Sequence, residues 1–181
     1  MVSNQPDRPR RAVAIRSELG EDTGEAGPGA AVRILFVCTG NICRSPTAEA
    51  VMRRLVDGAG LAGEFVLDSA GTGRWHAGGK PQRRAVAAGA ARGYLVGGTA
   101  RQVRPADFED FDLLVGMDRG HVRRLRDLSP DLESRLKVRP LLEDEDVPDP
   151  YGGPPAEFEQ ALDVIERGCR ALFEELTAAP F

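Results

Sequence analysis

A short apolar run that leads through a loop into a helix is the feature that most constrains this chain. Residues 32–37 read VRILFV, a β-rich segment typical of a strand buried on both faces of a sheet. The loop that follows, residues 38–45, reads CTGNICRS, and Pro46 suits the first turn of a helix. A buried strand joined in this way to a helix is the unit from which parallel α/β sheets are built.

The same alternation of strands and helices continues along the chain. Apolar residues at helical spacing predict further helices at 82–91, 118–128 and about 158–176. Strands are predicted at 65–67, 111–115 and 136–138, and an acidic, proline-rich loop at 143–155. We therefore expect an α/β fold, a three-layer sandwich whose four-stranded parallel sheet has helices on both faces.

The first 31 residues differ from the rest of the chain. They contain prolines, glycines and charges of both signs, with no sustained apolar period. This pattern predicts a disordered or loosely packed N-terminal tail over 1–31, with a short helix around 10–19 as the alternative. Residues 32–181 are long enough for one domain with a sizeable core.

Composition argues against several classes of partner. The chain of 181 residues has 24 basic and 28 acidic residues, a net charge of -4, which disfavours nucleic acid. No apolar stretch approaches the roughly 18 residues of a membrane span, and the N-terminus lacks the apolar core of a secretory signal. Three cysteines do not suggest a disulfide framework. We expect a cytoplasmic protein with no membrane partner, and a weak homodimer is left open.

The loop after the first strand has the chemistry of a phosphate site. Main-chain N–H groups at a helix N-terminus have no partner inside the helix, and the helix dipole adds about half a positive charge there. Gly40 takes a positive φ freely and Asn41 tolerates one, so the loop is expected to curl with its N–H groups inward. Arg44 can then hold two phosphate oxygens with its planar guanidinium group. The predicted phosphate-binding set is Thr39, Gly40, Asn41, Ile42, Cys43 and Arg44.

The cysteine at the start of this loop is the candidate nucleophile. A positive site stabilises a thiolate at Cys38 without a histidine base. Ser45 can donate a hydrogen bond to the sulfur and so help it leave, or it can act only as a helix cap. Taken alone, Cys38 would be read as a small buried hydrophobe, but the residues in register after it favour the phosphate site. Cys43 either lines the loop or pairs reversibly with Cys38 under oxidation.

Breaking a phosphate ester also needs a general acid for the leaving oxygen. The strongest carboxylate candidate is Asp149, in the segment VPDPYGG at 147–153, where prolines on either side stiffen the backbone. The alternative is a place in a solvated acidic loop, and spacing alone does not select Asp149. No metal is expected, because the two loop cysteines are not a CxxC pair and the chain has only two histidines.

Several separated segments agree, in order, with the motifs of a known family. They read VCTGNICRSPTAE at 37–49, SAGTG at 69–73, WH at 75–76, ARQV at 100–103, MDR at 117–119 and DPY at 149–151. By these segments the chain resembles the low-molecular-weight protein tyrosine phosphatases over about residues 32–177.

The resemblance implies a mechanism without metal or other cofactor. It implies that Cys38 attacks phosphorus to form a phosphocysteine, while Arg44 and the loop N–H groups hold the phosphoryl oxygens. Asp149 would first protonate the leaving oxygen and then activate the hydrolytic water. Trp75 and Tyr151 would form the walls of an aromatic substrate rim, and the implied partner is a phosphotyrosine-containing protein.

Two departures from the family pattern stand out. Gly98 lies where members often carry a histidine that braces the loop through residues matching Ser69 and Asn41. The segment QRRA at 82–85 is more basic than its usual counterpart. Together with Arg74 and Lys80 it favours acidic phosphopeptides, or it is a solvated charged face.

Three other functions are weighed against the tyrosine phosphatase. Related protein-arginine phosphatases tend to carry threonine where this chain has the branched, apolar Ile42. Similar arsenate reductases relay electrons through a further cysteine pair, but residues 44–168 contain no cysteine. A non-catalytic phosphopeptide-binding module would keep Arg44 without needing both Cys38 and Asp149. The sequence therefore predicts a cysteine-dependent phosphotyrosine phosphatase.

Overall fold

The computed structural model describes residues 31–178, and a four-stranded parallel sheet in the order β2-β1-β3-β4 forms its centre. β1 (Val32–Cys38) lies between β2 (Phe65–Gly71) and β3 (Leu113–Gly116), and β4 (Val138–Pro140) is an edge strand. Because every pair is parallel, the carboxyl ends of the strands meet at one edge of the sheet, where ligands bind in such folds. The predicted N-terminal tail and the alternative helix within it lie outside the described residues.

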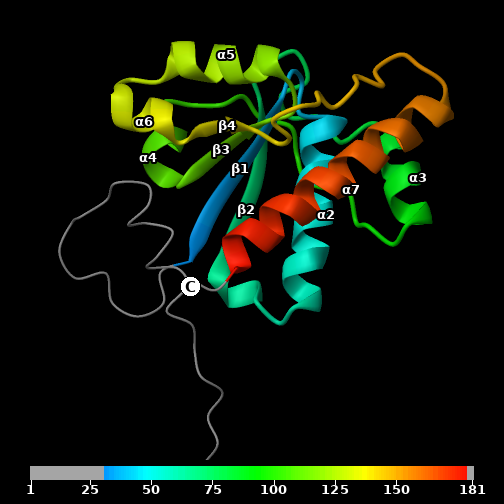
Figure 1. Cartoon of the computed structure of the whole chain (residues 1–181). Helices are drawn as coiled ribbons and strands as arrows, with labels where there is room; N and C mark the ends of the chain where they lie inside the picture. Colours follow the sequence, from blue (N-terminus) through cyan, green and yellow to red (C-terminus); the bar gives the residue numbers. More distant parts are fainter. Residues whose placement is uncertain (1–30, 179–181) are drawn as a thin grey trace, which may run out of the picture.

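Helices cover both faces of the sheet, which confirms the predicted three-layer sandwich (Figure 1). One face carries α2 (Arg44–Gly58), α3 (Arg83–Ala91) and α7 (Pro155–Thr177). The other carries α4 (Asp107–Asp110), α5 (Arg119–Leu128) and α6 (Leu132–Leu136), and a short 3-10 turn, η1 (Ala62–Glu64), precedes β2.

The apolar run in β1 supplies side chains to two separate cores. Ile34 and Phe36 lie in the cluster beneath α2 and α7, whereas Leu35 and Val37 lie in the cluster beneath α4 and α5. All four are fully buried. Side chains on a strand alternate between the two faces, so a strand covered on both sides must be apolar throughout.

The structure corrects the bounds of three strands. β2 runs on from the predicted 65–67 to Gly71, where the polar side chains Asp68 and Ser69 find partners of their own. β3 begins at Leu113 rather than Phe111, because Phe111 closes the short helix α4. β4 begins at Val138, and Leu136 instead ends α6 with 68% of its surface exposed.

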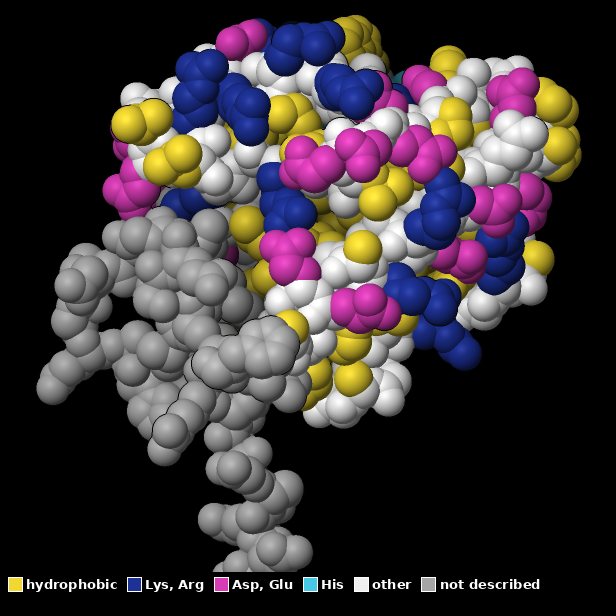
Figure 2. Space-filling model, in the orientation of Figure 1, with side chains coloured by type: hydrophobic (Ala, Val, Ile, Leu, Met, Phe, Trp, Pro, Cys, Tyr) yellow, Lys and Arg dark blue, Asp and Glu magenta, His cyan; other side chains and the backbone are white. Residues whose placement is uncertain are grey.

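The predicted helices agree closely with the observed ones. The predicted helix at 82–91 is α3, and that at 118–128 is α5, whose N-cap is Asp118. Basic side chains gather over α5, while acidic and basic side chains intermix over the rest of the face drawn in Figure 2. Within residues 31–178 no helix is both long and apolar enough to span a membrane.

Candidate active site

The loop between β1 and α2 lies at the carboxyl edge of the sheet, directly before a helix N-terminus. No side chain caps the start of α2, so its first N–H groups are available to a ligand, and Ser45 is not its cap. Asn41 has a φ of 56°, the left-handed conformation that the sequence predicted for it. Gly40 does not share it. A Cβ atom there would lie 2.8 Å from Cδ2 of His76, so a larger residue at position 40 would have to displace that ring.

The sulfur of Cys38 is part of a buried hydrogen-bond network. Its Sγ atom lies 3.0 Å from Oγ of Ser45, which accepts a hydrogen bond of 2.9 Å from Nδ2 of Asn41. The carbonyl oxygen of Ala70 lies 3.2 Å from the same hydroxyl. Ser45 has one proton, and because Asn41 donates to it, that proton goes to either the sulfur or the carbonyl.

The guanidinium group of Arg44 is fixed at one end and faces the pocket at the other. Nη1 donates to Oδ2 of Asp118 at 2.9 Å and to the carbonyl of Val147 at 3.1 Å. Nη2 lies 3.2 Å from Oδ2 of Asp149. The side chain is almost completely buried, so a carboxylate is needed to balance its charge. Sequence reasoning gave Asp118 no role, although the MDR segment contains it.

Asp118 and His121 form a reciprocal cap at the start of α5. Oδ1 of Asp118 accepts the main-chain N–H of His121 at 2.9 Å, and the main-chain N–H of Asp118 donates to Nδ1 of His121 at 3.2 Å. Burial raises the pKa of Asp118, but the hydrogen bond from His121 and the charge of Arg44 outweigh it, and the net pKa is lowered. Burial lowers the pKa of His121 to about 4, so its ring is neutral near neutral pH.

Asp149 reaches the same pocket from the loop before α7. The flanking prolines hold it in an extended segment, and its Oδ1 accepts the main-chain N–H of Tyr151 at 3.1 Å. Its side chain is half exposed, and its other oxygen faces Arg44. Asp149 therefore points toward Arg44 and the loop that begins at Cys38, and is not one of the carboxylates that face only solvent.

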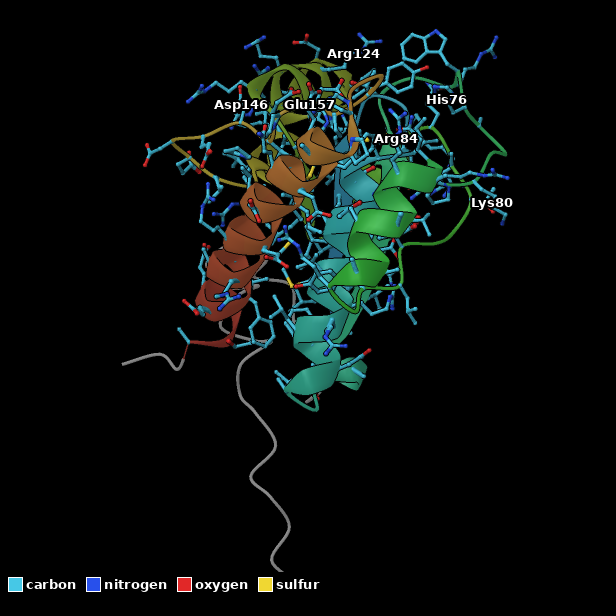
Figure 3. All side chains as sticks on the ribbon, turned by 90° about the vertical axis from the view of Figure 1, so that its right-hand side faces the viewer. His76, Lys80, Arg84, Arg124, Asp146 and Glu157 are labelled. Atoms are coloured by element: carbon cyan, nitrogen blue, oxygen red, sulfur yellow. The ribbon has the colours of Figure 1, made fainter. Side chains whose placement is uncertain are left out.

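A pocket of about 170 Å³ brings these groups together. Its lining residues are Cys38, Thr39, Gly40, Ile42, Cys43, Arg44, Trp75, His76, Asp149 and Tyr151. Trp75 and Tyr151 are 74% and 61% exposed at its mouth. His76, which sequence reasoning did not select, packs near Tyr151 with ring centroids 6.1 Å apart. Figure 3 shows His76 and Lys80 along the loop on one side of this end of the molecule, and Asp146 on the opposite side.

Cys43 has a different environment from Cys38. Its thiol donates to Oε1 of Gln82 at 2.9 Å. Burial, together with the nearby Cys38 and Asp149, raises its pKa to about 12. A thiol held in this form is a poor nucleophile, and both loop cysteines are reduced in this structure.

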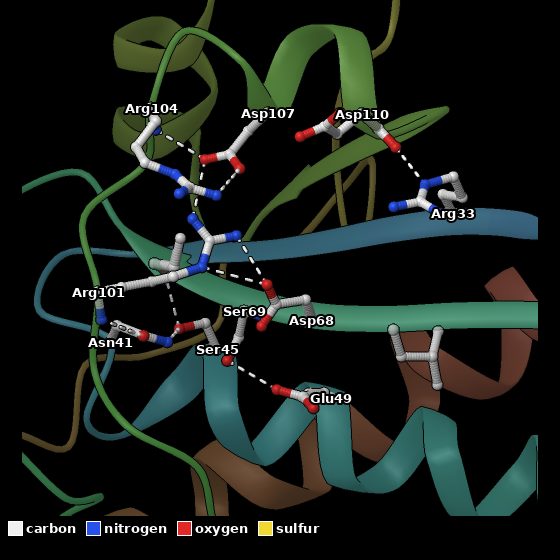
Figure 4. Close-up of polar contacts among 12 residues, drawn as sticks. Arg33, Asn41, Ser45, Glu49, Asp68, Ser69, Arg101, Arg104, Asp107 and Asp110 are labelled. Atoms are coloured by element: carbon white, nitrogen blue, oxygen red, sulfur yellow. Dashed lines mark hydrogen bonds and ion pairs between the residues drawn. The ribbon is translucent and has the colours of Figure 1, made fainter.

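A second network supports the loop from below (Figure 4). Oδ1 of Asn41 accepts the main-chain N–H of Arg101 at 3.0 Å, and the Arg101 guanidinium binds Asp68 at 2.8 Å and Asp107 at 2.9 Å. Ser69 donates to Glu49 at 2.8 Å. Asn41 is thus held between Ser45 and Arg101 without a histidine at position 98.

None of the residues between 31 and 178 forms a cluster of three or more His, Cys, Asp or Glu side chains that could hold a metal ion. The pocket itself brings together a thiol, a guanidinium, a carboxylate and main-chain N–H groups.

Comparison with known proteins gives one family. Residues 33–179 match the model of the family described as low molecular weight phosphotyrosine protein phosphatase. A low molecular weight protein-tyrosine-phosphatase of Streptomyces coelicolor is 45% identical over 148 residues, which cover 77% of this chain and 90% of the relative.

Solved structures agree with this result. A protein tyrosine phosphatase from Entamoeba histolytica superposes with a TM-score of 0.78 at 36% identity, covering 81% of this chain and 97% of that one. An arginine phosphatase, YwlE, superposes with a TM-score of 0.74 at 30% identity, covering 80% and 95%. Its structure is of a mutant with a phosphorylated active-site serine.

Proposed function

The chain belongs to the low molecular weight phosphotyrosine protein phosphatase family, and from this premise we propose that Cys38, Arg44, Asp149 and Ser45 are its catalytic residues. Enzymes of this family are cysteine-dependent phosphomonoester hydrolases that act on protein phosphotyrosine. The observation that carries the assignment is the shared pocket, in which the sulfur, the guanidinium and the carboxylate meet above uncapped helix N–H groups.

The first half of the reaction transfers the phosphoryl group to sulfur. The Cys38 thiolate attacks phosphorus, and the bond from phosphorus to the ester oxygen breaks. Asp149, in its acid form, gives its proton to that oxygen, and the alcohol leaves. The loop N–H groups and Arg44 hold the three equatorial oxygens as charge shifts among them. Nη2 of Arg44, which faces Asp149, exchanges that carboxylate for a phosphoryl oxygen.

The second half hydrolyses the phosphocysteine. The Asp149 carboxylate takes a proton from a water molecule, whose oxygen attacks phosphorus while the sulfur–phosphorus bond breaks. The Ser45 hydroxyl turns its single proton from the Ala70 carbonyl to the sulfur and stabilises the departing thiolate. Inorganic phosphate leaves, and the starting enzyme is restored.

Phosphotyrosine is the substrate that the pocket mouth favours. Trp75 and Tyr151 offer aromatic faces to a phenyl ring, and the partly buried, apolar Ile42 of the loop lines the same pocket. The likeness to the YwlE arginine phosphatase keeps phosphoarginine as a second candidate.

Finer expectations belong to the same proposal. We place the catalytic domain at 32–181 and the protein in the cytoplasm, where a nucleophilic thiol stays reduced. A weak homodimer stays a prediction.

Two substitutions test the assignment. Cys38→Ser should abolish turnover of an aryl phosphate but retain its binding, measured by calorimetry. Asp149→Asn should slow departure of a poor leaving group by ~10²–10⁴-fold, the usual size of general-acid catalysis. Turnover of Cys38→Ser at the wild-type rate would refute the covalent route.

The substrate is tested with three peptides of the same sequence that carry phosphotyrosine, phosphoserine or phosphoarginine. We expect the highest kcat/KM for phosphotyrosine. A higher kcat/KM for phosphoarginine would transfer the assignment to the second candidate.

A further inference from the structure

Thr39 carries a hydroxyl group at the pocket wall, and the mechanism above uses only its main-chain N–H. The side chain is exposed and lines the pocket together with Asp149. Its Oγ1 atom lies 2.8 Å from Nε2 of His121, a histidine that is only 4% exposed. A buried histidine therefore fixes the hydroxyl of a residue that lines the pocket.

The position of the proton on His121 decides how Thr39 is held. Nδ1 accepts the main-chain N–H of Asp118 at 3.2 Å. A neutral imidazole has one donor and one acceptor nitrogen, so Nε2 carries the proton and donates a hydrogen bond to Oγ1 of Thr39. Oδ1 of Asp118 also lies 3.1 Å from Nδ1, but the main-chain N–H of Asp118 is directed at that nitrogen, which needs a free lone pair there.

When the Thr39 hydroxyl accepts a hydrogen bond from histidine, its own O–H group can still donate a hydrogen bond to another acceptor. Across residues 31–178, His121 is the one hydrogen-bond partner recorded for Oγ1 of Thr39. Thr39 and Asp149 line the same pocket, so both residues lie beside the place where a bound phosphate ester would sit.

We propose that Thr39 is a further substrate-contacting residue, whose hydroxyl is fixed by the Nε2–H of His121 and donates a hydrogen bond to an oxygen of the phosphate ester beside Asp149. The proposal rests on the phosphatase function above and adds a side-chain donor to a site so far described by main-chain donors and one arginine. His121 acts through Thr39 and is a positioning residue.

The hydroxyl is tested by a matched pair of variants. Thr39→Val keeps the branched shape and removes the donor, whereas Thr39→Ser keeps the donor. We expect kcat/KM on aryl phosphates to fall ~10–100-fold in Thr39→Val, the size of one hydrogen bond to a charged group, and to recover most of that loss in Thr39→Ser. An unchanged kcat/KM in Thr39→Val, or an equal loss in both variants, would overturn the proposal.

Aryl phosphates of graded leaving-group pKa locate the acceptor. A loss in Thr39→Val that grows with leaving-group pKa supports a bond to the ester oxygen, and a uniform loss supports a bond to a non-bridging oxygen. Thr39→Val should still form the phosphocysteine on Cys38. If the proposal on Thr39 is wrong, the phosphocysteine still forms. If the phosphatase assignment is wrong, no phosphocysteine forms in any of these proteins.

A second pair tests the role of His121. The amide of His121→Gln can place a donor near the position of Nε2, and the shorter His121→Asn can only replace Nδ1. We expect a loss like that of Thr39→Val in His121→Asn, recovery in His121→Gln, and no additional loss when His121→Asn is added to Thr39→Val. Additive losses would show that His121 acts through Asp118 and Arg44 instead, against the proposal. Nitrogen-15 NMR of the His121 ring should find the proton on Nε2, and a proton on Nδ1 would contradict it.

Discussion

At the scale of single residues, the two ends of Arg44 have different partners. Nη1 is bound to Asp118 and to the carbonyl of Val147, while Nη2 faces the pocket. A buried cation without a carboxylate partner is strongly destabilising, so Asp118 allows Arg44 to be both buried and directed at a ligand. The sequence predicts Arg44 from its place in the loop. It does not predict Asp118, which lies 74 positions away and meets Arg44 only in the folded chain.

The buried imidazole of His121 predicts how stability depends on pH. Burial lowers the pKa of His121 from 6.5 to about 4. Between these values the unfolded chain binds a proton at this residue that the native protein does not, so the free energy of unfolding falls as the pH is lowered. We expect His121 to contribute a loss of ~2 kcal/mol between about pH 7 and about pH 5.

Urea unfolding of the wild type and His121→Gln at both pH values measures this contribution. The other histidine, His76, is present in both proteins and cancels in the comparison. The pH dependence should be weaker in His121→Gln. Identical slopes in the two proteins would show that His121 titrates alike in the native and unfolded states.

At the scale of elements, the loop between β1 and α2 is held by the side chain of Asn41, a residue whose backbone conformation is unusual. Asn41 adopts a φ of 56° and joins Ser45 to the main chain of Arg101. The left-handed region costs an L-residue ~1–2 kcal/mol, whereas glycine adopts it freely. The conformation and the hydrogen bonds of Asn41 can therefore be separated experimentally.

Asn41→Gly and Asn41→Ala provide that separation. Both variants lose the hydrogen bonds to Ser45 and Arg101, so kcat/KM should fall in both. Only Asn41→Ala keeps the strain, and it should be less stable than Asn41→Gly by ~1 kcal/mol in chemical denaturation. Equal stability of the two variants, or full activity of either, would contradict this view of the loop.

Sequence patterns predicted most helices and strands because the apolar residues in them follow a clear spacing or form an unbroken run. α3, α5 and α7 follow from apolar spacing, and β1 follows from an unbroken apolar run. The short helices α4 and α6 were missed because four or five residues are too few to show a helical period. The start of β4 was shifted for the same reason, since Leu136 resembles a strand residue until α6 is known.

At the scale of the whole molecule, the fold class was predictable but the spatial order of the strands was not. Alternating strands and helices indicate a parallel sheet, yet only the structure puts β1 between β2 and β3. This order brings the β1 loop, the end of β3 and the loop before α7 to one edge. Sequence spacing could not select Asp149 from its acidic neighbours, because its role depends on this arrangement.

Ion pairs far from the site join two helices of the same layer. Arg92, at the end of α3, binds Glu159 at 2.6 Å, Asp163 at 2.7 Å and Glu166 at 3.0 Å, all on α7. The position of α7 in turn anchors the segment that carries Asp149 and Tyr151. The contact between α3 and α7 therefore helps to position one wall of the pocket.

The central claim is that the sulfur of Cys38 receives the phosphoryl group. Rapid mixing with an aryl phosphate, acid quench and mass spectrometry of the Cys38 peptide test it most directly, with Cys38→Ser as the control. We predict a burst of the released phenol and a phosphoryl group on Cys38 in the first turnover, and neither in the control. Steady release of phenol with an unmodified Cys38, or a phosphoryl group on another residue, would contradict the account.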